Sequence, residues 1–70
     1  MDELNFKLSI KAIAAQFDMS IETMANECGI PYNHLKMVSS GYVKMTAEDI
    51  EKISIRFDIP MRCIQTDYSK

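Results

Sequence analysis

The chain has 70 residues, of which 47% are hydrophobic, and its 8 basic and 10 acidic side chains give a formal net charge of −2. A chain of this length forms one domain over residues 1–70 and buries only roughly 60% of its unfolded surface, so the core uses nearly all its apolar side chains and leaves few for a deep active-site cleft. The composition excludes simple disorder, and the slight acidity argues against strong non-specific binding to nucleic acid.

The first two predicted helices follow from apolar residues at helical spacing, and no run alternates as a strand would. The first helix is expected over about residues 3–17, ending at Asp18, a residue type that tolerates a left-handed conformation. Its inward stripe consists of Phe6, Ile10, Ile13, Ala14 and Phe17. The second helix is expected over about residues 20–28, with Ser20 as its N-cap and Gly29 in the left-handed position that ends it.

The third predicted helix covers about residues 31–39, because Pro31 suits the first turn of a helix. Leu35 and Val38 give it one narrow apolar face, and Gly41 closes it. The turn before this helix is so short that the third helix must cross the second helix steeply.

The last two helices are predicted downstream of this pair. Thr46 and Asp49 form a capping box that opens a fourth helix, which ends before Pro60. A short fifth helix is expected to carry Met61, Ile64 and Tyr68 on one side. The predicted fold class is therefore all-α, a compact bundle of five short helices, with a frayed tail at residues 66–70.

The segment from the second to the third helix carries a recognisable motif. It reads Met24-Ala25-Asn-Glu-Cys28-Gly29-Ile30, followed by Leu35 and Gly41. This pattern resembles the helix-turn-helix domain of phage Cro and CI repressors and their bacterial relatives. The resemblance covers roughly residues 5–65. It implies a lambda-repressor-like fold and a small transcriptional regulator, of phage, prophage or bacterial origin, that binds operator DNA through the major groove.

The resemblance also implies which residues contact double-stranded DNA. Asn33 suits an adenine edge, Met37 a thymine methyl group and Lys36 a phosphate. The full set of candidate binding residues is Tyr32, Asn33, His34, Lys36, Met37, Ser40, Tyr42 and Lys44. No acidic residue lies between Cys28 and Ala47, so this segment carries a local charge of +2 from its two lysines, Lys36 and Lys44.

A second interpretation stays open, in which the same fold is an antirepressor or modulator that binds a partner repressor protein. Ile21 occupies the place of a phosphate-binding Gln of the family, and Ala14 that of a basic residue. Met37 and Val43 are expected to be exposed apolar groups, which often mark contacts with another protein.

Four apolar or aromatic residues near the C-terminus are expected to cover the core, and those that the core does not need are expected to form a homodimer interface. These residues are Phe57, Met61, Ile64 and Tyr68.

No pattern predicts catalysis, a cofactor or a small-molecule substrate. His34 is expected to be a solvated residue without a carboxylate near it in sequence, and it makes no zinc spacing with Cys28 or Cys63. Two reduced thiols are the simpler interpretation of the cysteines, although a disulfide stays open. With no signal peptide and no apolar run of about 18 residues, we expect a cytoplasmic protein without membrane contact.

Overall fold

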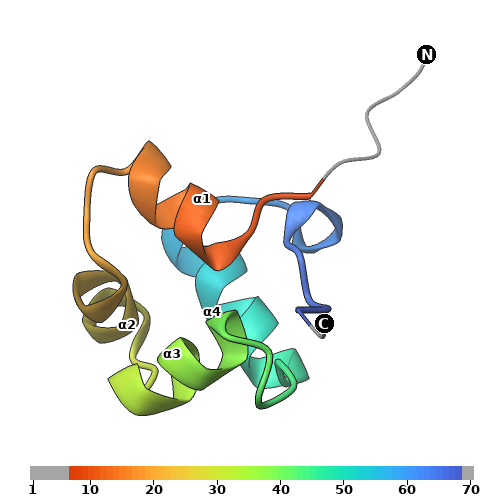
Figure 1. The fold of residues 1–70 in the computed structure, drawn as a ribbon. Coiled ribbons are helices and arrows are strands. Elements are labelled where there is room, and N and C mark those ends of the chain that lie inside the picture. Colours follow the sequence, from red (N-terminus) through yellow and green to blue (C-terminus); the bar gives the residue numbers. More distant parts are fainter. Residues whose placement is uncertain (1–6, 69–70) are drawn as a thin grey trace.

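Four α-helices and one turn of 3-10 helix form the regular structure in a computed structural model that describes residues 7–68 (Figure 1). In chain order they are α1 (Ile10–Gln16), α2 (Ile21–Cys28), α3 (Tyr32–Ser39), α4 (Ala47–Phe57) and η1 (Met61–Cys63). The predicted all-α class is confirmed for this part of the chain.

Local capping residues determine where three of the helices begin. The hydroxyl of Ser9 accepts a hydrogen bond from the Ala12 N–H, and the Ser20 hydroxyl starts α2 in the same way. Thr46 and Asp49 form both halves of the predicted capping box at the start of α4. These side chains satisfy backbone N–H groups that have no partner within the first helical turn.

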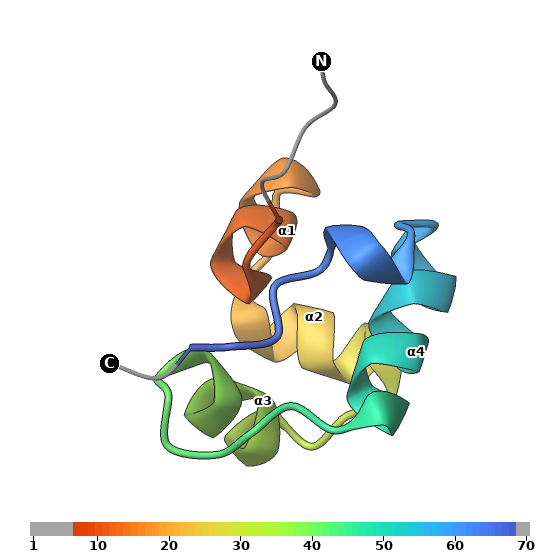
Figure 2. The ribbon, with the colours of Figure 1, turned by 90° about the vertical axis from the view of Figure 1, so that its right-hand side faces the viewer.

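The core lies where α1, α3 and α4 pack around α2, which contacts all three (Figure 2). Its fully buried large side chains come from every part of the described chain and are Ile10, Ile13, Met24, Leu35, Val38, Ile53 and Ile64. Ala25 is also fully buried, as expected where α3 crosses α2. The close crossing is possible because a methyl group is the whole side chain at that position.

The first helix is shorter than predicted. Helix α1 begins at Ile10 because Ser9 caps it, and Leu8 before it is extended. The predicted start of the helix and Phe6 lie outside the described residues. Phe17, which we expected to point inward, is 43% exposed and packs its ring against Phe57, with the ring centroids 4.7 Å apart.

The predicted fifth helix is wrong beyond its first turn. After η1 the chain is extended, and Ile64 pairs with Leu8 in an isolated parallel β-bridge. The Leu8 N–H donates to the Cys63 carbonyl at 2.7 Å, and the Gln65 N–H donates to the Leu8 carbonyl at 2.8 Å. Backbone pairing with the start of the chain therefore replaces the helical hydrogen bonds that the apolar spacing suggested.

The end of the described chain is tied to its beginning. The Tyr68 hydroxyl accepts a hydrogen bond from the Ile10 N–H at 2.9 Å, and burial raises the pKa of this phenol despite that bond. Residues 66–68 thus differ from the frayed tail expected at 66–70, and residues 69–70 lie outside the described part.

Of the four residues expected to cover the core or form a homodimer interface, two cover the core as predicted. Phe57 and Ile64 are buried in the core of their own chain, so they have no surface left for a second copy. Met61 is exposed, while Tyr68 is partly buried.

Candidate functional site

The turn between α2 and α3 sets the position of the candidate binding helix. Gly29 has a φ of 72°, in the left-handed region that only glycine adopts without strain. Its N–H donates to the Ala25 and Asn26 carbonyls, and the Ile30 N–H donates to the Ala25 carbonyl at 2.9 Å. These bonds close the end of α2, so that α3 can begin three residues after Gly29.

Helix α3 has a clear inside and outside. Leu35 and Val38 are fully buried, so the residues that follow the opposite side of a helix with about 3.6 residues per turn are directed to solvent. We call these exposed residues the outer face of α3; they are Tyr32, Asn33, Lys36, Met37 and Ser40. The Lys36 ammonium lies 5.9 Å from the centre of the Tyr32 ring, a weak cation–π contact on an exposed surface.

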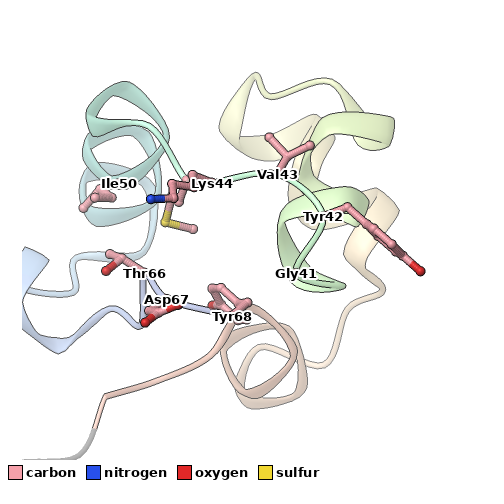
Figure 3. A pocket seen from close by; sticks show the side chains of 9 residues that line it. Gly41, Tyr42, Val43, Lys44, Ile50, Thr66, Asp67 and Tyr68 are labelled. Atoms are coloured by element: carbon pink, nitrogen blue, oxygen red, sulfur yellow. The ribbon is translucent and has the colours of Figure 1, made fainter. Parts of the chain in front are cut away.

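The loop after α3 contributes the remaining predicted site residues. Gly41 turns the chain with a φ of 88°, and the Tyr42 N–H donates to the Met37 carbonyl at 3.0 Å. Tyr42 is 79% exposed, and Lys44 is exposed as well. An open pocket of about 570 Å³ separates this loop from the C-terminal residues 66–68 (Figure 3).

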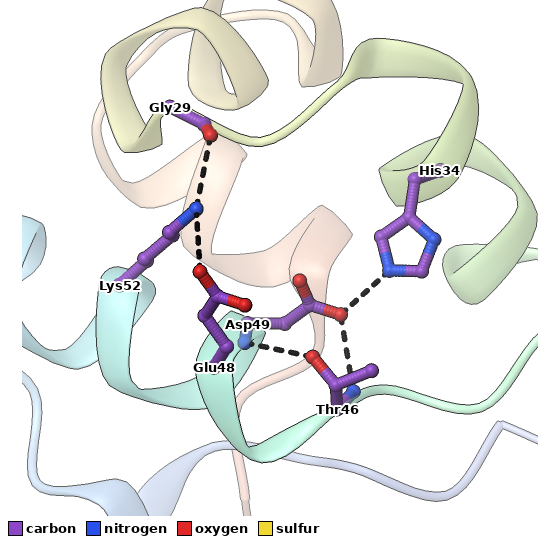
Figure 4. A network of polar contacts seen from close by, with 6 residues as sticks. All are labelled: Gly29, His34, Thr46, Glu48, Asp49 and Lys52. Atoms are coloured by element: carbon purple, nitrogen blue, oxygen red, sulfur yellow. Dashed lines mark hydrogen bonds and ion pairs between the residues drawn. The ribbon is translucent and has the colours of Figure 1, made fainter.

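The expectation that His34 is a solvated residue is met only in part, because its side chain is 29% exposed and contacts a carboxylate from a distant part of the sequence. Its Nε2 lies 2.7 Å from Oδ2 of Asp49, fifteen residues later in the chain (Figure 4). The same Oδ2 accepts a hydrogen bond from the Thr46 N–H at 3.0 Å. This network ties α3 to the start of α4, and His34 therefore lies beside the outer face instead of on it.

The Asp49 carboxylate is held in its ionised form by these contacts. Burial alone would raise its pKa, but the hydrogen bonds from the Thr46 backbone and from His34 outweigh burial and lower the pKa below the ordinary value. Asp49 is the one buried charged residue in the described chain. It is a structural acid, because all its contacts serve the cap of α4 and the His34 ring.

Each ion pair found in residues 7–68 has a member on α4. On α4, Lys52 pairs with Glu48 at 3.3 Å and donates to the Gly29 carbonyl, and Arg56 pairs with Glu27 of α2. Within residues 7–68, no carboxylate forms an ion pair with Lys36 or Lys44. The outer face of α3 and the loop after it thus contain no acid of their own, while Asp67 lines the pocket beside the loop.

Sequence reasoning missed the Asp49 contact, although the capping box had identified that carboxylate. An N3 aspartate uses one oxygen for the cap and keeps acceptor capacity for another donor. The sequence does not indicate that His34 is this donor, because only the packing of α3 on α4 brings the two side chains together.

Other kinds of site find no support in the part of the chain that the structure describes. No three His, Cys, Asp or Glu side chains lie close enough together there to hold a metal ion. Cys28 and Cys63 are free thiols, and burial raises the pKa of Cys28. None of the helices between residues 7 and 68 has the length and apolar character needed to cross a membrane.

Comparisons with protein-family models, curated proteins and solved structures found no match to this chain. The functional argument therefore depends on the chemistry and geometry of the residues themselves.

Proposed function

We propose that this protein is a small helix-turn-helix regulator that binds duplex DNA with α3 in the major groove. The observation that carries the proposal is the outer face of α3: a rigidly supported set of polar and cationic side chains with no acid among them. Asn33 on this face has the paired donor and acceptor that an adenine edge requires, and Met37 offers an apolar contact for a thymine methyl group.

The start of α3 supports the same proposal. It is the one α-helix in the described chain whose N-cap, Pro31, makes no side-chain hydrogen bond to the first turn. Free N–H groups at a helix start, together with the positive end of the helix dipole, favour a phosphate group. Such a contact would fix the position of α3 on the DNA backbone while its side chains read bases.

Low charge sets the expected strength of binding. Lys36 on α3 and Lys44 in the following loop form no ion pair within residues 7–68, so we expect one domain to neutralise about two phosphates. A single domain contacts too little DNA for tight specific recognition, and we propose that two domains bind one operator.

A selection experiment tests the proposal. Duplexes that bind the protein at low salt are selected from a randomised library and sequenced. We expect an enriched motif whose adenine preference is lost in Asn33→Ala, and weaker binding to all sequences in Lys36→Ala. Lys11→Ala, which removes an equal charge from the exposed side of α1, is the matched control and should leave the adenine preference and the duplex affinity unchanged. Failure to enrich any motif would contradict sequence-specific binding.

The second candidate function is that of a protein-binding modulator, and exposed apolar side chains at the end of α3 favour it. Met37 is 44% exposed, and Tyr42 and Val43 follow it in the loop with exposed side chains. Such a cluster is typical of protein contacts. If a host repressor co-purifies with the protein, Met37→Ala and Tyr42→Ala should release it more strongly than Lys36→Ala does; DNA binding predicts the reverse order of effects on duplex affinity.

A further inference from the structure

His34 has an orientation that an ordinary surface histidine lacks. Its side chain is 29% exposed, whereas the Asp49 carboxylate that holds it is only 8% exposed. The residue lies on the flank of α3, next to buried Leu35 and close to the outer face. One edge of the ring is thus anchored inside the protein while the rest reaches the solvent.

The anchor determines which ring nitrogen carries a proton. An ionised carboxylate only accepts hydrogen bonds, so Nε2 must be the donor to Asp49 Oδ2 at 2.7 Å. The other nitrogen, Nδ1, points away from Asp49 (Figure 4), and no residue between 7 and 68 forms a hydrogen bond with it. In the neutral ring Nδ1 is therefore an acceptor, and it becomes a donor only when the ring takes up a second proton.

The charges around the ring favour an anion at Nδ1. From α4, the group that meets the ring is Asp49, while Glu48 and Lys52 of the same helix pair with each other. The charged residues of α3 and the following loop are Lys36 and Lys44; Lys36 lies on the outer face of α3, and Lys44 lines the pocket that Asp67 also lines. In residues 7–68 the Nε2 side of the ring thus faces the Asp49 carboxylate, whereas no ion pair brings a carboxylate to the Nδ1 side.

We infer that His34 is a proton-linked contact for a phosphate oxygen of nucleic acid, with Asp49 as the residue that positions it. This inference rests on the proposed function, because the phosphodiester is the anion that the outer face of α3 would meet. A neutral Nδ1 and a phosphate oxygen are both acceptors and repel each other. A neutral ring must therefore take up one proton on binding, whereas a ring that is already protonated takes up none; in the complex Nδ1–H donates to the phosphate while Nε2–H still donates to Asp49.

The chain contains a single histidine, which makes the test direct. Its ring Hε1 resonance is followed by proton NMR between pH 5 and 8.5 for the free protein, with inorganic phosphate, and with the selected duplex. We expect the titration midpoint to move upward when the duplex is bound. Linked to this, duplex affinity should rise as the pH falls through the titration range, by up to about tenfold per pH unit.

Two variants separate the contact from the fold. In His34→Gln the amide can still donate to Asp49 but cannot take up a proton, so duplex affinity should become independent of pH between 6 and 8. In Asp49→Asn the side-chain oxygen can still cap α4, but the charge that keeps the proton of the neutral ring on Nε2 is lost. The neutral ring can then carry its proton on Nδ1 and donate it to the phosphate without taking up another, so the midpoint shift on binding should shrink. Circular dichroism confirms that each variant is folded before its affinity is measured.

The outcomes distinguish this inference from the proposed function. A duplex that binds and is weakened by Lys36→Ala, with an unchanged His34 midpoint, overturns the inference and leaves the proposed function standing. A protein that binds no duplex at any pH overturns both. An equal midpoint shift with inorganic phosphate, at the same concentration of phosphate groups, assigns the site to free phosphate and overturns the nucleic-acid assignment.

Discussion

Asp49 should contribute more to stability than any other charged residue, because its carboxylate serves two partners at once. Asp49→Ala removes the acceptor of the Thr46 N–H at 3.0 Å and of the His34 Nε2–H at 2.7 Å. A hydrogen bond to a charged group contributes about 1.5–3 kcal/mol. Water can reach exposed Thr46 and partly exposed His34 and satisfy them in part, so we expect a net loss of about 2–3 kcal/mol instead of the full sum.

The assay is urea unfolding followed by circular dichroism at neutral pH. With a slope of about 1 kcal/mol per molar urea for a small domain, the Asp49→Ala midpoint should fall by about 2–3 M. Asp49→Asn keeps an acceptor for the cap and should lose only about 1 kcal/mol. Glu51→Ala, an exposed acid on the same helix, is the control and should change the midpoint little. A loss below about 0.5 kcal/mol in Asp49→Ala would refute the reasoning.

The contribution of Asp49 to folding stability should also depend on pH. Its pKa is lower in the folded chain than the ordinary value of 3.8, so the folded state binds this proton less tightly than the unfolded state does. The stabilisation is complete above the unfolded pKa and is lost as the pH falls through the lower folded pKa. The stability difference between the native chain and Asp49→Asn should therefore shrink in strong acid, and a constant difference down to pH 2 would contradict it.

Three further substitutions test the fold. Gly29→Ala should cost about 1–2 kcal/mol in thermal or urea unfolding, because its φ of 72° strains any residue with a Cβ although the space is open; an unchanged midpoint would contradict the left-handed end of α2. Tyr68→Phe removes the acceptor of the Ile10 N–H and should cost about 1 kcal/mol, whereas Tyr42→Phe at an exposed position should cost nothing measurable. Ile64→Ala should cost about 2–5 kcal/mol, because the side chain is fully buried; a loss under 1 kcal/mol would show that residues 63–68 do not cover the core.

Local signals in the sequence predicted most of the helix ends correctly. Ser20, Gly29 and the Thr46–Asp49 pair act within three or four residues of themselves, so their chemistry can be recognised without knowing the fold. Asp18 adopts the expected left-handed conformation with a φ of 57° for the same reason. The burial of Leu35 and Val38 followed from their spacing on one narrow helix face.

The incorrect predictions concern contacts between distant parts of the chain. Ile64 fits a helical spacing with Met61, yet pairing with Leu8 fixes it in an extended conformation, and no periodicity signals a partner 56 residues away. In the same way, His34 could be placed on α3 but not against Asp49. The candidate site could thus be located on its helix from the sequence, whereas the polar network that orients part of it depends on packing.

The salt dependence of duplex binding tests the central claim most directly. Anisotropy titrations between 50 and 200 mM salt, on the selected duplex and on an unrelated one, give the number of phosphates that the protein neutralises. At about 0.9 per phosphate contact, we expect a slope of log affinity against log salt of about −2 for each bound domain, reduced by about 1 in Lys36→Ala and unchanged in Lys11→Ala. A slope near zero, or one that Lys36→Ala leaves unaltered, would contradict a DNA contact through α3.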